Sequence, residues 1–194
     1  DFADELIDDL NTLDWDESIK QAQREWIGRK EGSIITFKLI NDGVDSIIDV
    51  FTTRADTLFG VTYLVLAPEH DMVHNLKSQI SNWNEVETYL KEVEKKSDLD
   101  RQQSKEKSGV QLEGIEAINP ATGKPISIWV ADYVLVGYGT GAVMAVPGHD
   151  SRDYAFAKHY KLPIKEVIKG GNIKQAAYEE KSGKIRPTCV PATN

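Results

Sequence analysis

The chain of 194 residues is long enough for one domain with its own core, and its 40% hydrophobic and 28% charged residues are typical of a globular protein. A single cysteine, Cys189, excludes an internal disulfide framework, and the absence of a signal peptide and of a long apolar run predicts a cytoplasmic location. The net charge of −8 arises within residues 1–17, which hold eight of the 31 acidic residues and none of the 23 basic ones. The neutral remainder excludes a general nucleic-acid binder, because such proteins gain affinity by neutralising phosphates.

The N-terminal part predicts two short helices followed by a β-hairpin. Residues 3–11 indicate an acidic helix, and residues 17–27 indicate a second helix with an apolar stripe at helical spacing, ended by Gly28. Strands are expected at residues 34–39 and 47–53, joined by the hairpin signal Asn41-Asp42-Gly43. The missing initiator methionine and the abrupt C-terminus favour a piece of a longer protein.

The rest of the chain alternates predicted strands with predicted helices. Strands are expected at residues 62–67, 110–118, 126–136, 142–146 and 163–168, and helices within residues 71–105 and at residues 150–160. Because the strands come in hairpins rather than in regular βαβ units, the predicted fold is α+β, with a β-barrel-like bent sheet of hairpin strands surrounded by helices. Three tryptophans are expected in the core: Trp15, Trp26 and Trp129.

Two segments concentrate residues that can carry chemistry. The first, residues 51–60 (FTTRADTLFG), leaves a strand and holds three threonines, an arginine and an aspartate. Its purely structural interpretation is a strand end with Asp56 or Thr57 as a helix cap. The second, residues 137–154, has glycines that permit close backbone approach, and then a helix that Asp150 or Ser151 would cap. Asp153 would lie in the first turn of that helix, where a carboxylate is favoured even without a function.

Several familiar sites do not fit the second segment. It lacks the Gly-Lys-Ser/Thr ending of a P-loop, and its Gly-x-Gly run does not open a helix as in dinucleotide-binding folds. His149, Asp150 and Asp153 have no partner cluster elsewhere that would complete a metal site. Ser151 lacks the sharp turn that presents a nucleophilic serine.

Together, the two segments resemble the threonine-rich and aspartate motifs of the editing domain of bacterial-type leucyl-tRNA synthetases. The matching residues are 52–60 (TTRADTLFG) and 139–153, with further matches at residues 13–29 and 126–135, so the resemblance covers about residues 5–168. The family usually has proline at the positions of Asp16 and Ala55, and serine at that of Lys30. The resemblance implies a helical segment from the parent synthetase at residues 1–29, an editing domain at residues 30–170, and a tail of unexplained origin at residues 171–194.

The resemblance implies an aminoacyl-tRNA hydrolase that acts in post-transfer editing. Because one methylene group is worth only about 1–3 kcal/mol in a binding pocket, a synthetase needs a second, hydrolytic selection. The expected substrate is mischarged tRNA(Leu) carrying norvaline, isoleucine or methionine, with leucine excluded. Signatures of a synthetic site are absent, so amino-acid activation is not expected, and neither a cofactor nor a metal ion is implied.

The implied partner is the 3′ acceptor end of tRNA(Leu), bound by a monomer that does not associate with membranes. Aminoacyl-adenosine or AMP-like ligands, and boron compounds that trap a diol, would suit such a site by family analogy. Two alternatives stay open. One is a binding module that holds the tRNA end or an adenosine-like ligand without catalysis, and the other is an unrelated esterase.

The same resemblance implies a role in substrate binding or catalysis for individual side chains. Asp153 would hold the α-ammonium group of the ester through a charge-assisted hydrogen bond, and the γ-methyl group of Thr57 would exclude leucine. Thr52 and Thr53 would lie near the ester and hold water or the developing oxyanion, which makes these two and Asp153 the candidate catalytic residues. Arg54 would face the terminal adenosine or its phosphate. The other residues implied to lie at the substrate are Asp56, Leu58, Tyr138, Met144, Val146, His149 and Asp150.

Overall fold

The computed structural model describes residues 2–28, 32–40, 46–103, 108–137, 139–170, 172–179 and 184–185. The chain divides into two compact units, residues 1–32 and residues 33–194. In the described ranges, no helix combines the length and the apolar character that crossing a bilayer requires. The predicted hairpin turn at Asn41-Asp42-Gly43 lies outside these ranges.

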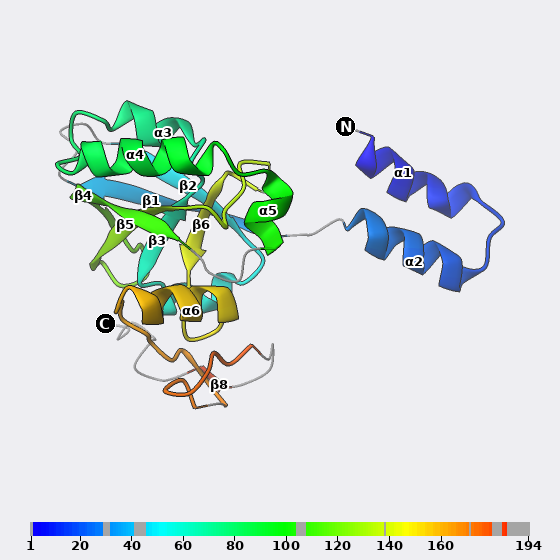
Figure 1. Ribbon diagram of the computed structural model, residues 1–194. Coiled ribbons are helices and arrows are strands. Elements are labelled where there is room, and N and C mark those ends of the chain that lie inside the picture. Colours follow the sequence, from blue (N-terminus) through cyan, green and yellow to red (C-terminus); the bar gives the residue numbers. More distant parts are fainter. Residues whose placement is uncertain are drawn as a thin grey trace. The chain divides into compact units, whose positions relative to one another are not determined.

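The first unit is a helical hairpin, drawn in blue in Figure 1. It consists of α1 (Ala3–Asp9), the 3-10 helix η1 (Leu10–Thr12) and α2 (Glu17–Ile27). The Asp16 carboxylate caps α2 by accepting the Ser18 amide at 2.9 Å, and Gly28 ends the helix at φ 73°, as predicted. The prediction that Trp15 and Trp26 lie in the core is wrong, because they are 49% and 88% exposed. Two short helices do not provide enough surface to enclose a tryptophan.

The second unit is built on a six-stranded mixed sheet with the strand order β2-β1-β4-β5-β3-β6. Its strands are β1 (Ser33–Ile40), β2 (Ile47–Thr52), β3 (Tyr63–Leu66), β4 (Gly109–Ile118), β5 (Pro125–Ala131) and β6 (Ala142–Ala145). The hairpins β1–β2 and β4–β5 are antiparallel, as predicted, whereas β3 pairs parallel with β5 and antiparallel with β6. The fold is therefore α+β.

The predicted β-barrel is wrong, because the sheet is open. The edge strands are β2 and β6, and no hydrogen-bonded ladder joins them within the described strands. Closure of a barrel requires a continuous ring of ladders. The four residues of β6 are paired only with β3, so the ring is not completed.

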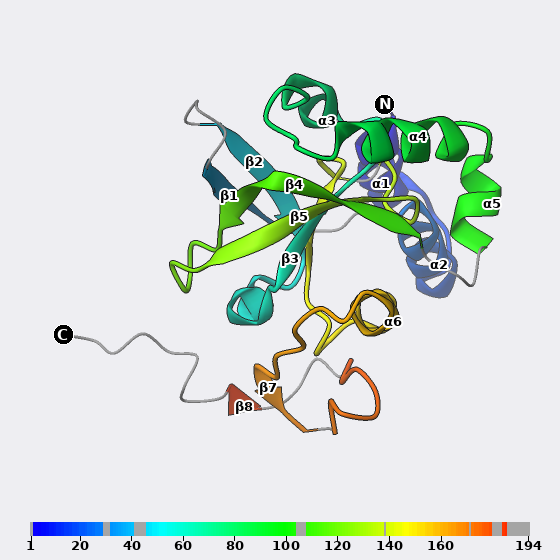
Figure 2. The same cartoon turned by 60° about the vertical axis from the view of Figure 1, so that its left-hand side comes forward.

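Helices cover the two faces of the sheet (Figures 1 and 2). The helices predicted within residues 71–105 are confirmed as α3 (Asp71–Asn75), α4 (Trp83–Val93) and α5 (Asp98–Gln103). The predicted helix at residues 150–160 is confirmed as α6 (Ser151–His159). The predicted strand at residues 163–168 is wrong: only Ile168 belongs to a strand, in the short ladder of β7 (Ile168–Lys169) with β8 (Lys184–Ile185).

Strand β3 divides the core into two clusters, because its successive side chains point to opposite faces of the sheet. Leu64 and Leu66 belong to the cluster that packs against α3 and α4, and Tyr63 belongs to the cluster that packs against α6. Trp129 lies in the second cluster at 6% exposure, as predicted, with its ring against Phe156. The segments on either side of β3 are thus fixed to a strand that is buried on both faces.

Candidate functional site

The threonine-rich segment is a tight turn held by its own side chains. After β2 ends at Thr52, the Thr52 Oγ1 atom accepts the Arg54 amide at 3.0 Å. The 3-10 helix η2 (Ala55–Gly60) follows, and Arg54 precedes it without a side-chain cap, so the prediction that Asp56 or Thr57 caps a helix here is wrong. The Thr57 hydroxyl instead donates to the Arg54 carbonyl at 2.8 Å.

Arg54 and Asp56 form a bidentate ion pair on this turn. The Arg54 Nε and Nη2 atoms each lie 2.9 Å from a different oxygen of Asp56. Hydrogen bonding to Arg54 holds the pKa of Asp56 below its ordinary value, so this carboxylate is ionised at neutral pH. Thr53 is exposed beside the pair, whereas Thr57 is buried.

Asn119 links the backbone of η2 to the turn between β4 and β5. Its side-chain amide is buried and donates to the Leu58 carbonyl at 3.0 Å, while its side-chain oxygen accepts the Ala121 amide at 2.9 Å. Leu58 packs its side chain against the first hydrophobic cluster. The sequence marks Asn119 only as a turn residue, so its contact with η2 was not predicted.

The aspartate segment is organised by both local and long-range hydrogen bonds. Asp150 caps α6 by accepting the amides of Arg152 and Asp153 at 2.8 and 3.0 Å, as predicted. Asp153 lies in the first turn, also as predicted, but it is buried. One of its carboxylate oxygens accepts the Val146 amide at 2.8 Å, and the other accepts the Tyr133 hydroxyl at 3.3 Å.

The environment of Asp153 changes its titration. Burial, and secondarily the negative charge of Asp150, raises the pKa of Asp153 to about 7, although the Val146 amide opposes the shift. A carboxylate whose only role is to interact with the N-terminus of a helix is more stable in its ionised form when it is exposed to solvent. Burial penalises that ionised form. A buried carboxyl group that titrates near neutrality is a feature of functional sites.

His149 uses both ring nitrogens on the protein backbone. Its Nε2 atom accepts the amides of Val167 and Ile168 at 3.0 and 3.2 Å, so the ring proton lies on Nδ1, which is 2.9 Å from the Tyr178 carbonyl. His149 therefore holds the chain after α6 against the aspartate segment through the amides of Val167 and Ile168. Within the described residues, no group of three or more His, Cys, Asp or Glu side chains is placed to hold a metal ion.

The two segments lie against each other at the β3–β6 junction. The Thr62 amide donates to the Ala145 carbonyl at 3.2 Å, and a Cβ atom on Gly60 would lie 3.1 Å from the Val146 side chain. Gly139 has φ 62°, and a Cβ atom there would lie 3.1 Å from the Cβ atom of Phe51. The structure thus brings η2, the end of β2 and the start of the aspartate segment into one region.

Two other residues named from the sequence are buried in this region, and one lies outside the described ranges. Met144 and Val146 both belong to the first hydrophobic cluster, and Met144 is paired with Leu64 across β3 and β6. Tyr138 lies outside the described residues. Val146 also lies against Gly60 at the end of η2. The role of Met144 and Val146 as pocket walls stays a prediction.

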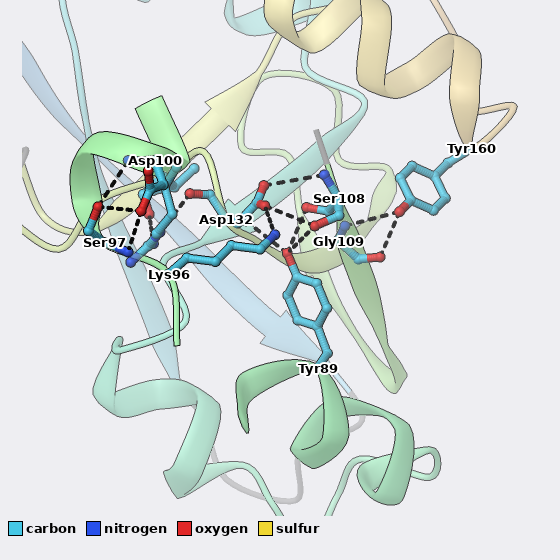
Figure 3. A network of polar contacts seen from close by, with 10 residues as sticks. Tyr89, Lys96, Ser97, Asp100, Ser108, Gly109, Asp132 and Tyr160 are labelled. Carbon is cyan, nitrogen blue, oxygen red and sulfur yellow. Dashed lines mark hydrogen bonds and ion pairs between the residues drawn. The ribbon is translucent and has the colours of Figure 1, made fainter. Parts of the chain in front are cut away.

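Asp132 is the centre of a buried polar network that was not predicted (Figure 3). Its Oδ2 atom accepts Lys96 Nζ and Ser108 Oγ, both at 2.9 Å. Arg101 donates to the Asp132 and Val134 carbonyls, each at 2.8 Å. These partners are 24 to 36 residues away in sequence, so no local pattern could have revealed them.

Known proteins are similar to this chain in sequence and fold. The sequence profile described as "Leucyl-tRNA synthetase, editing domain" matches residues 24–189. Leucine–tRNA ligases from Mycobacterium leprae (strain Br4923) and Mycobacterium bovis (strain BCG / Pasteur 1173P2) are 54% and 52% identical over 196 residues, which cover 91% of this chain and 20% of each relative. A crystal structure of the ternary complex of Agrobacterium radiobacter K84 agnB2 LeuRS, tRNA and LeuAMS is similar, with a TM-score of 0.72 and 35% identity over 90% of this chain and 21% of that chain. The chain spans about a fifth of the length of these relatives.

Proposed function

This chain belongs to the leucyl-tRNA synthetase editing domains, and we propose that it removes wrong amino acids from tRNA(Leu) by hydrolysing their ester bond. The proposed substrates carry norvaline, isoleucine or methionine, and leucine is excluded. The observation that carries the proposal is the buried carboxylate of Asp153, whose pKa is raised to about 7. It accepts the amide of Val146, and the Val146 side chain lies against Gly60 at the end of the threonine-rich segment.

Asp153 is the proposed anchor of the substrate. Its carboxylate is oriented by the Val146 amide and the Tyr133 hydroxyl, each bonded to a different oxygen. A carboxylate has about four lone-pair sites, so capacity remains for the α-ammonium group that every aminoacyl ester carries. The resulting ion pair is favourable in a buried site because little water competes for either charge. The anchor orients all aminoacyl esters and does not discriminate among them.

Thr57 is the proposed gate against leucine. Because its hydroxyl is bonded to the Arg54 carbonyl at 2.8 Å and the residue is buried, rotation of the side chain is restricted and the γ-methyl group has a fixed position. A fixed methyl group can collide with the branch of leucine while a straight side chain passes. Specificity then comes from a clash with the wrong substrate rather than from tighter binding of the right one.

The proposed chemistry is attack of a positioned water molecule on the ester carbonyl. The bond between the carbonyl carbon and the ribose oxygen breaks, which releases a free amino acid and a tRNA with a free ribose hydroxyl. Thr52 and Thr53 would hold the water or the developing oxyanion with their hydroxyl groups. The sequence offers no evident nucleophile, and an aminoacyl ester is activated enough for positioning and the substrate's own ribose hydroxyl to suffice. We propose that no cofactor takes part.

The proposed partner is the 3′ end of tRNA(Leu), met in the cytoplasm by a monomeric chain. Two N–H groups of Arg54 bond Asp56, and its other donors would serve the terminal adenosine or its phosphate. Outside residues 1–17 the chain has equal numbers of acidic and basic residues, which supports contact with a short end of the tRNA rather than with its whole backbone.

A deacylation assay tests the proposal. The chain is mixed with Ile-tRNA(Leu) and, in parallel, with Leu-tRNA(Leu), and the loss of each ester is followed against a blank without protein. We expect the isoleucyl ester to be hydrolysed faster than in the blank. The leucyl ester should be lost at the same rate as in the blank. If binding is measurable but both esters follow the blank, the chain is a binding module, and hydrolysis of simple esters without an α-amine would indicate an unrelated esterase.

A further inference from the structure

Two tyrosine hydroxyls approach Asp153, but they bond different atoms. The Tyr133 hydroxyl donates to the carboxylate at 3.3 Å, whereas the Tyr63 hydroxyl donates to the main-chain carbonyl of Asp153 at 3.0 Å. Tyr133 therefore acts on the group that would meet the substrate, and Tyr63 acts on the backbone of α6. The two hydroxyls also form a hydrogen bond with each other, so a change at Tyr63 reaches Tyr133 as well.

The position of Tyr133 is fixed from two sides. Arg101 is buried and donates to the carbonyls of Asp132 and Val134, which flank Tyr133 in the chain. The ring of Tyr133 packs on Phe156 with centroids 5.6 Å apart, and Phe156 lies three residues after Asp153 on α6. Backbone anchoring and ring packing both limit how far the hydroxyl can move from the carboxylate.

Tyr133 is a neutral donor at physiological pH. Burial and the charge of Asp153 raise the pKa of the Tyr133 phenol well above its ordinary value of 10. The charged groups that act on Asp153 are Asp150, which opposes its ionisation, and Arg152, which favours it. The Tyr133 hydrogen bond adds to the effect of Arg152, because it stabilises the ionised form of the carboxylate.

We propose that Tyr133 is a positioning residue of the editing site: its hydroxyl holds the Asp153 carboxylate in the ionised form and in the orientation that receives the α-ammonium group of the substrate. This inference rests on the proposed function, in which Asp153 is the anchor. Tyr133 does not touch the reacting atoms. Its effect is largest at slightly acidic pH, where the carboxylate of Asp153 begins to protonate.

The test compares the wild-type chain with Tyr133→Phe and with Tyr160→Phe, whose lost hydroxyl belongs to the same aromatic cluster but bonds the backbone of Gly109. The rate kcat/KM for deacylation of Ile-tRNA(Leu) is measured between pH 5.5 and pH 8.5, after circular dichroism has shown that each variant is folded. For Tyr133→Phe we expect the acidic limb of the profile to move to higher pH, with a loss of about 3- to 10-fold at pH 6.5 and recovery toward the wild-type rate at pH 8.5. For Tyr160→Phe the midpoint of the acidic limb should stay in place.

Other outcomes overturn the proposal. A Tyr133→Phe profile that superimposes on the wild type, or that falls equally at every pH, shows that the hydroxyl does not act through the carboxylate. If the wild-type chain does not hydrolyse the ester at all, the proposed function fails separately. Carbon NMR titration of the Asp153 carboxyl group then decides the matter for Tyr133, because an unchanged midpoint in Tyr133→Phe contradicts the proposed contact and a raised midpoint supports it.

Discussion

The threonine-rich turn and the aspartate segment position their side chains in opposite ways. In the turn, the hydrogen bonds of Thr52, Arg54 and Thr57 join residues two or three positions apart in the chain. In the aspartate segment, the carboxylate of Asp153 is bonded by groups 7 and 20 residues away. The side chain of the proposed gate is therefore held by local hydrogen bonds, whereas the proposed anchor depends on the assembled fold.

The two regions also differ in electrostatics. The Arg54–Asp56 pair is partly exposed, with side-chain exposures of 26% and 42%, and it lowers the pKa of Asp56. Asp153 is buried without a bidentate cation, and its pKa is raised to about 7. An exposed pair contributes little to stability, while a buried carboxyl group destabilises the fold once it ionises. Ionisation of Asp153 thus carries a free-energy cost that the Arg54–Asp56 pair does not.

Removal of the anchor should have the largest effect. We expect Asp153→Ala to lower kcat/KM for Ile-tRNA(Leu) by about 1,000-fold, because loss of one partner of a buried charge pair costs about 3–5 kcal/mol. Asp49→Ala is the matched control, since Asp49 is an exposed carboxylate whose bond is to Thr36 on the neighbouring strand. Near-normal turnover of Asp153→Ala in the deacylation assay would rule out the anchor role.

The buried carboxyl group should also make stability depend on pH. In the unfolded chain Asp153 titrates near 3.8, and in the folded chain near 7, so its contribution to stability is fully present below about pH 4 and is lost as pH rises through about 7. Asp153→Asn cannot ionise, so we expect it to gain stability relative to the wild type between pH 5 and pH 8, by up to about 4 kcal/mol. Urea unfolding at pH 5 and at pH 8 measures the free energy of unfolding of both proteins. If Asp153→Asn differs from the wild type by the same amount at the two pH values, the buried carboxyl group is not the cause.

Changes at the gate should alter selectivity rather than turnover. We expect Thr57→Ala to keep hydrolysing Ile-tRNA(Leu) while its rate on Leu-tRNA(Leu) rises by about 10- to 100-fold, as expected for one methyl group in a binding pocket. Thr57→Ser separates the two parts of the side chain, because it keeps the hydroxyl that bonds the Arg54 carbonyl and lacks the methyl group. If Thr57→Ser still spares the leucyl ester, the methyl group is not the gate.

The smallest effect is expected for the exposed ion pair. Asp56→Ala should lower the free energy of unfolding by less than about 1 kcal/mol, because water and salt screen an exposed pair. Glu87→Ala, which breaks an exposed pair with Lys91 on α4, should behave alike and serves as the control. A loss of 2 kcal/mol or more for Asp56→Ala in urea unfolding would show that the local turn, too, depends on the fold around it.

The same contrast explains what could be predicted from the sequence. Gly28 and Asp150 were correctly placed at helix ends, because capping depends on residues within one turn. The open sheet was missed, since the parallel pairing of β3 with β5 joins residues 64 positions apart in the chain and leaves no local pattern. Trp26 was misplaced, because helical spacing shows an apolar face but does not show what covers it.

Prediction of the candidate site was limited in the same way. The motifs named the two segments that hold Thr57 and Asp153, and the structure brings those segments together. Tyr133 and Asn119 were missed as side chains that act on them, because each meets its partner through tertiary contacts. His149 was named as a substrate contact, a role that stays a prediction, while its clamp on the backbone of Val167 and Ile168 was not foreseen.

The contact of Asn119 with η2 has an evolutionary consequence. Asn119 lies 61 residues from Leu58 in the chain, yet its amide supports the carbonyl of the residue next to Thr57. A replacement at this turn would shift the backbone under the gate while every residue of the two motifs stayed the same. Substitution of Asn119 is therefore a route to altered amino-acid selectivity that lies outside both motifs.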